Sequence, residues 1–174
     1  MRKSTFIKHI NQLEEEDLRT ELKQLYTKLD AVKKFYKLEL GSDADRTKLY
    51  AVAKKNIASK YATKSFRKPR RPRIQKINNI LRNLAKEAIF SYEMIDIYLF
   101  TTETALEFMD TYDFYSTPLH NNISGSFTKA VKLIRDNRMV SEYDERCQTI
   151  IKKTRFFYEL KRELEHEYEN YILE

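Results

Sequence analysis

The amino-acid sequence is poor in the residues that form turns, disulfides and phosphate-binding loops. Its 174 residues include only 2 glycines, 3 prolines and 1 cysteine, and no tryptophan. Collagen-like chains and most all-β folds need many more glycines and prolines, so the composition excludes them. Gly41 and Gly125 stand alone, which leaves no glycine-rich loop for a nucleotide. The lone Cys147 excludes an internal disulfide framework and fits a reducing compartment.

Long apolar runs are also absent. No stretch approaches the roughly 18 apolar residues of a membrane-spanning helix, and the first residues lack the apolar core of a signal peptide. We therefore expect a cytoplasmic protein that does not insert into a membrane. The length favours a single domain over residues 1–174, and an apolar fraction of 41% supplies a core beneath a charged surface.

Helical periodicity dominates what is present. Apolar residues recur at spacings of three and four from Leu18 to Leu40, which predicts one helix that ends at Gly41. We call this stripe the leucine seam; it consists of Leu18, Leu22, Leu25, Leu29, Val32, Tyr36 and Leu40. A chain this short is expected to bury its best apolar stripe, so we place the leucine seam in the core.

Similar stripes predict the remaining helices. Two of them are Tyr50, Ala53, Ile57 and Tyr61, and then Ile74, Ile77, Leu81, Leu84 and Ala88. The run from Ile95 to Phe100 is apolar almost all round, so its helix is expected at the centre. Helix starts are predicted at Ser4, Ser42 or Asp43, Pro72, Ser91 and Ser141, with a break at Pro118. The prediction is an all-α, single-domain bundle of six or seven helices, with solenoid-like helix pairs as an alternative arrangement.

Residues 63–73 interrupt the helical pattern. Pro69 and Pro72 disfavour helical geometry in the residues before them, so this segment is predicted to be an extended connection. It lies within residues 46–86, which contain 14 Lys or Arg and no Asp or Glu; we call this stretch the acid-free block. Residues 1–45 carry 9 basic and 9 acidic residues, whereas residues 87–174 carry 10 basic and 17 acidic ones. The charge is therefore strongly segregated along the chain.

A block of one sign repels itself unless a partner offsets its charge. Lys and Arg that neutralise phosphates release counterions, which gives affinity for nucleic acid without any sequence reading. Phe66 and Tyr61 flank the connection and are candidates to stack on unpaired bases, while Gln75 and Asn78 share a polar helix face with Arg82. The predicted function is a non-enzymatic module that binds RNA, DNA or another polyanion through a basic surface. The predicted binding residues are Lys54, Lys55, Lys60, Lys64, Phe66, Arg67, Lys68, Arg70, Arg71, Arg73, Lys76, Arg82 and Lys86.

The sequence also permits three other interpretations. Acidic residues of later helices, such as Asp96, Glu103, Glu107 and Asp110, are candidates to neutralise the acid-free block internally. An acidic protein is an alternative partner. In a different class of function, the leucine seam or the aromatic last helix forms a homo-oligomer or receives a partner helix.

No catalytic residue, metal site or cofactor is predicted. His9, His120 and His166 are distant in sequence, and Glu163 with His166 is the only Glu-x-x-His pair, whereas a di-iron bundle needs two. A surface charge pair is the expected role of that motif. Cys147 lies on the apolar side of the last predicted helix, so we expect a buried thiol rather than a nucleophile.

The order of features resembles a family of small bacterial helical proteins known only as a domain of unknown function. The matching stretches are residues 13–36, residues 57–61 followed by Arg67-Lys68-Pro69, and Ser126-Phe127 with Ala130. The resemblance implies that one domain spans the chain and that the basic connection is a family feature. It brings no activity and no site residues.

Overall fold

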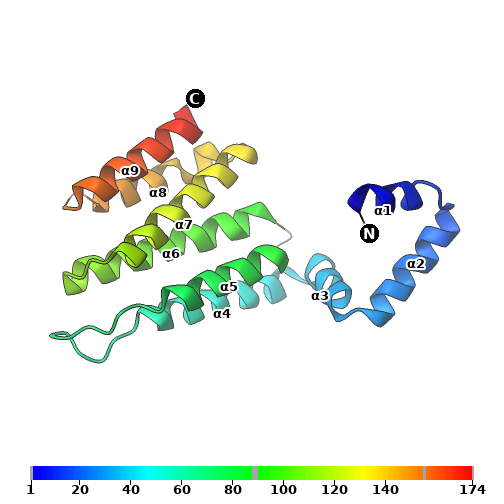
Figure 1. Ribbon diagram of the computed structural model, residues 1–174, viewed down its shortest axis with the longest axis horizontal. Helices are drawn as coiled ribbons and strands as arrows, with labels where there is room; N and C mark the ends of the chain where they lie inside the picture. The colour runs from blue at the N-terminus through cyan, green and yellow to red at the C-terminus, as the bar shows by residue number, and fades with distance from the viewer. Residues whose placement is uncertain (1, 88–89, 155, 174) are drawn as a thin grey trace. The chain divides into compact units, whose positions relative to one another are not determined.

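A computed structural model describes residues 2–87, 90–154 and 156–173, and all regular structure within them is helical (Figure 1). The all-α prediction is confirmed, but the predicted count of six or seven helices is too low, since these residues form nine α-helices. The helices are α1 (Lys3–Ile10), α2 (Glu15–Lys28), α3 (Asp30–Glu39), α4 (Asp43–Tyr61), α5 (Ile74–Glu87), α6 (Ser91–Tyr112), α7 (Thr117–Asp136), α8 (Val140–Lys153) and α9 (Tyr158–Tyr168), followed by a π-helical turn, η1 (Glu169–Leu173).

Two breaks that the sequence pattern does not reveal account for the extra helices. Leu29 adopts an extended backbone (φ −117°, ψ 115°) and separates α2 from α3, although the apolar spacing continues across it. Near Thr154 the predicted last helix divides into α8 and α9. There the Thr154 hydroxyl donates to the Ile151 carbonyl at 2.6 Å, and the Phe157 N–H donates to the Thr154 carbonyl at 2.8 Å. Apolar spacing indicates which residues share a helix face, but it does not predict local hydrogen bonds of this kind.

Predicted helix ends are right where a side chain or backbone contact enforces them. The Ser42 hydroxyl accepts the Asp45 N–H at 3.3 Å and so caps α4. Gly41 follows the end of α3, and a Cβ there would collide with the Lys37 carbonyl oxygen. The other helices begin within two residues of their predicted starts. Helices α1 and α8 begin one residue before Ser4 and Ser141, α5 begins two residues after Pro72, and α6 begins at Ser91 itself. Pro118, predicted as a break, lies inside the first turn of α7. A proline is tolerated in a first turn because the N–H it lacks has no intrahelical partner there.

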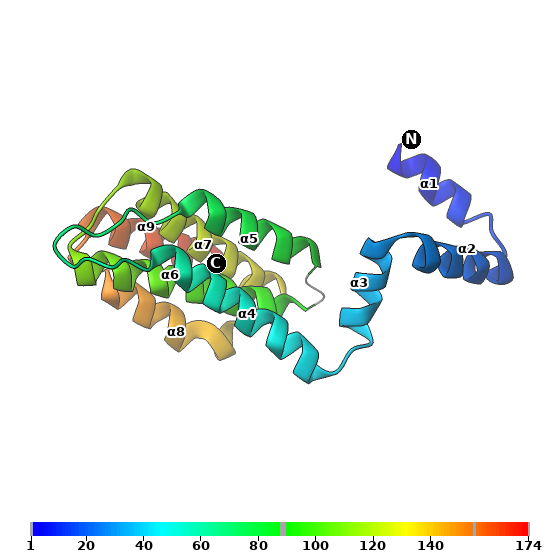
Figure 2. The same ribbon diagram turned by 90° about the horizontal axis from the view of Figure 1, so that it is seen from below.

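The chain divides into two compact units, Met1–Asp45 and Arg46–Glu174. One domain across both units therefore stays a prediction. In the second unit the successive helices form three pairs, α4 with α5, α6 with α7, and α8 with α9. Figures 1 and 2 show these pairs side by side, with α5, α7 and α9 in one layer and α4, α6 and α8 in the other. The solenoid-like arrangement of helix pairs stays a prediction.

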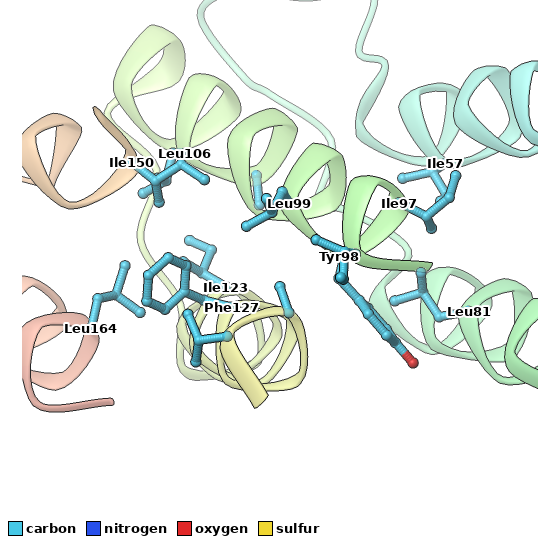
Figure 3. Packing of buried hydrophobic residues seen from close by; sticks show 14 of the residues in the cluster. Ile57, Leu81, Ile97, Tyr98, Leu99, Leu106, Ile123, Phe127, Ile150 and Leu164 are labelled. Atoms are coloured by element: carbon cyan, nitrogen blue, oxygen red, sulfur yellow. The ribbon is translucent and has the colours of Figure 1, made fainter. Parts of the chain in front are cut away.

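Helix α6 lies at the centre of the second unit, as its apolar run predicts. It buries 12 of its 22 residues, and Ile95, Ile97 and Leu99 have no exposed surface. Figure 3 shows Ile57 of α4 directed at Ile97, and Leu81 of α5 lying near Tyr98. The predicted stripes of α4 and α5 are buried, apart from the half-buried Ile74; Ala88 lies outside the described residues. No described helix is long and apolar enough to cross a membrane.

The first unit differs, because none of its described residues is buried. In the leucine seam, the exposed fraction is 47% for Leu22, 39% for Leu25, 47% for Leu29 and 80% for Leu40. The prediction that this seam lies in the core is therefore wrong. Three short helices offer each other too little apolar surface to enclose a side chain, whereas the paired helices of the second unit enclose many.

Candidate nucleic-acid interface

The connection between α4 and α5 is a closed loop organised by Thr63. The Thr63 hydroxyl oxygen accepts the Arg70 N–H at 3.0 Å and the Ser65 N–H at 3.4 Å. The Arg73 N–H donates to the Lys60 carbonyl at 3.2 Å, which joins the two ends of the connection. Residues 63–73 are non-helical, as predicted, but these bonds fold them back into a loop, so the segment is not extended. We call residues 63–73 the basic loop.

The predicted binding side chains of the basic loop are all exposed. They are Lys64, Phe66, Arg67, Lys68, Arg70, Arg71 and Arg73. Phe66 is 72% exposed, and its ring packs against Tyr112 of α6 with 5.6 Å between the ring centroids and 52° between the planes. The basic loop therefore exposes several cations and one aromatic ring, and the ring is held in place by its contact with Tyr112.

Most cations of the acid-free block have no described carboxylate within 4.0 Å. Lys55, Lys76, Arg82 and Lys86 are exposed, and the partly exposed Lys60 donates to the Ser59 hydroxyl at 2.9 Å. The twelve cations without a described ion pair are Lys48, Lys55, Lys60, Lys64, Arg67, Lys68, Arg70, Arg71, Arg73, Lys76, Arg82 and Lys86. Their charge is available to an outside partner.

The two remaining cations are bound to carboxylates of α6. Arg46 lies 3.4 Å from Glu93, with both side chains nearly buried, and it also stacks over Phe90. Lys54, a predicted binding residue, lies 2.5 Å from Asp96. Because a buried or half-buried ion pair is costly to open, we leave Lys54 out of the candidate interface.

The carboxylates of α6 are themselves shared with another helix. Arg146 of α8 donates to Asp96 at 2.8 Å and makes two bonds of 2.8 Å to Glu103. Partial burial alone would raise the pKa of Asp96, but hydrogen bonds from Lys54 and Arg146 outweigh it and hold that pKa below its ordinary value. Internal neutralisation within the described residues thus reaches two of the 14 cations of the acid-free block.

Tyr61 does not serve as a stacking platform. It is 4% exposed, and its hydroxyl donates to the Asn122 side chain of α7 at 2.6 Å. Asn122 in turn donates to Asn78 at 3.1 Å, so the Asn78 side chain predicted on the polar face of α5 is already engaged. Burial raises the pKa of the Tyr61 hydroxyl. The membership of Tyr61 in the apolar stripe with Ala53 and Ile57 is the sequence signal for this role.

His120 takes part in a chain of side-chain hydrogen bonds that the sequence does not predict. The His120 Nε2 atom lies 2.6 Å from Glu163 of α9, its Nδ1 atom lies 3.0 Å from the Tyr115 hydroxyl, and Ser124 donates to the same Glu163. Partial burial alone would raise the pKa of Glu163, but the bonds from Ser124 and His120 hold that pKa below its ordinary value. The spacing of His120 and Ser124, four residues apart on α7, is the only sequence signal for this chain of bonds.

The other titratable candidates have structural surroundings. Cys147 is 1% exposed, so the predicted buried thiol is confirmed, and burial raises its pKa to about 12. His166 lies 3.0 Å from the Asn170 amide. Among the described residues, no group of three or more His, Cys, Asp or Glu is placed to hold a metal ion.

Comparison with known proteins adds the family and nothing about activity. No curated protein and no solved structure matches the chain. The sequence model of one family, described as a family of unknown function, matches residues 1–172. This match covers both compact units and agrees with the resemblance seen in the sequence. The chain therefore belongs to DUF6155, a family of unknown function.

Proposed function

We propose that this protein is a non-enzymatic module that binds nucleic acid through the basic loop and the exposed cations of α4 and α5. The observation that carries the proposal is the set of twelve cations without a described ion pair in a stretch that holds no acidic residue. Such a concentration of charge opposes compact folding unless a polyanion offsets it. A cytoplasmic location, which the single cysteine favours, belongs to the same proposal.

The construction of the basic loop supports a gripping role. The Arg73–Lys60 backbone bond joins its ends, and the Thr63 hydroxyl accepts the Ser65 and Arg70 N–H groups, so less conformational entropy remains to be lost on binding. Arg67, Arg70, Arg71 and Arg73 carry planar guanidinium groups that bind a phosphate through two parallel hydrogen bonds. Phe66 offers a ring on which an unpaired base stacks.

Salt-dependent binding tests this proposal. The full chain is titrated into labelled single-stranded RNA, single-stranded DNA and duplex DNA at several salt concentrations. Replacing Arg70, Arg71 and Arg73 by Ala removes three phosphate contacts, so the slope of log affinity against log salt should flatten by about 2 units for single strands and nearly 3 for duplex DNA.

A matched variant separates a local interface from general attraction. Lys152, Lys153 and Arg162 are equally exposed but lie in the acidic part of the chain, so replacing them by Ala removes the same charge. This variant should keep the wild-type slope. No binding by the wild type at low salt, or equal flattening in the two variants, would overturn the proposal.

A further inference from the structure

The first unit carries many large apolar side chains that are exposed. Beyond the leucine seam, Phe6 is 43% exposed, Ile7 45%, Tyr26 49% and Phe35 45%. Large exposed apolar surfaces on soluble proteins often mark a site at which a partner binds. The unit also has equal numbers of basic and acidic residues, so net charge does not oppose its association with a copy of itself.

The C-terminal half of α2 and the facing side of α3 form a groove of about 770 Å³. Leu22, Tyr26 and Tyr36 supply apolar lining, and Lys23, Lys33 and Lys37 bring positive charge to it. Lys33 lies 3.3 Å from Asp30, whereas Lys23 and Lys37 have no described carboxylate within 4.0 Å. An occupant that fits this groove presents an apolar stripe with acidic residues beside it.

The N-terminal end of α2 combines acidic residues with an apolar stripe, as such an occupant requires. Four acidic residues, Glu14 to Asp17, stand at its start, immediately before the leucines of the seam. Arg19 binds Glu15 at 2.5 Å and approaches Glu16 at 4.0 Å, while Glu14 and Asp17 have no described cation within 4.0 Å. The helix has 14 residues and is therefore about 21 Å long, so its acidic start and its lysine-lined end are well separated.

We infer that the leucine seam is covered by the first unit of a second copy of this chain, with the two α2 helices antiparallel. Under two-fold symmetry, the acidic start of each α2 then meets the lysine-lined groove of the other copy, and both contacts form at once. A parallel arrangement would set acid against acid and lysine against lysine. The leucines that are exposed in one copy bury one another, which supplies the apolar gain.

Charge reversal tests both the partner and its direction. One variant carries Glu14→Lys and Asp17→Lys, and a second carries Lys23→Glu and Lys37→Glu. The mass of each full-length protein is measured by light scattering over a range of concentrations, without nucleic acid, and circular dichroism checks that helices are retained. The wild type should reach twice the 21.0 kDa of one chain, and each variant alone should dissociate at least tenfold more readily.

Restoring the complementarity should restore the dimer. An equimolar mixture of the two variants, and a single chain that carries all four reversals, should both dimerise about as well as the wild type. Loss of a helix by mutation cannot produce such recovery. A wild type that stays monomeric at every concentration, or variants that dimerise unchanged, would overturn the inference. The result is independent of the proposed nucleic-acid interface, because none of these residues belongs to it.

Discussion

Phe66 and Phe127 are the same residue type in opposite surroundings. Phe127 of α7 has no exposed surface, and Figure 3 shows it among Ile123 and other core residues, whereas Phe66 is 72% exposed. Phe127→Ala should therefore lower the free energy of unfolding by about 3–5 kcal/mol, measured by urea denaturation. Phe66→Ala should change it by less than about 1 kcal/mol, but should weaken binding to single strands by about 1–3 kcal/mol. Equal destabilisation by both variants would mean that the contact of Phe66 with Tyr112 is structural.

Asp96 links three helices through its two cationic partners, and its contribution should depend on pH. A carboxyl group whose pKa is lowered on folding stabilises the protein above its unfolded pKa, near 4, and loses that effect as the pH falls through the folded value. Asp96→Asn should therefore destabilise the protein at pH 7, and the difference from the wild type should shrink below about pH 4. Urea denaturation at pH 7 and pH 3 measures both differences. A difference that does not change with pH would show that the ion pairs with Lys54 and Arg146 contribute nothing.

At the scale of the helices, apolar spacing predicts which residues share a face, and other helices decide whether that face is buried. The stripes of α4 and α5 have the same kind of spacing as the leucine seam, yet only those two stripes are buried, in one core cluster with residues of α6 and α7. The break at Leu29 leaves the spacing intact, so no residue pattern marks it. By contrast, proline restricts the backbone locally, so the sequence does predict that the segment at 63–73 is not helical.

In the candidate interface, too, the sequence predicts some features, and contacts between helices decide the others. The absence of acidic residues from 46–86 is visible in the sequence, and so is the concentration of arginine beside Phe66. The ion pair between Lys54 and Asp96 is not visible in the sequence, because it forms only when α4 packs on α6. The same holds for Tyr61, which bonds to Asn122, 61 residues further along the chain. Contacts between helices distant in sequence therefore decide which members of a charged or aromatic set stay free.

At the scale of the whole molecule, the two compact units should differ in the protection of their backbone. The second unit has a core around α6, while the first has no described buried residue, so its helices open at little cost when they stand alone. Hydrogen exchange on the full chain should then show slow amides in α6 and α7 and fast ones in α2 and α3 at low protein concentration. Because association covers the leucine seam, protection of α2 and α3 should rise with protein concentration, whereas that of α6 and α7 should not. If α2 and α3 are already as protected as α6 in the most dilute sample, their apolar face is covered within a single chain, and a second copy is not what stabilises it.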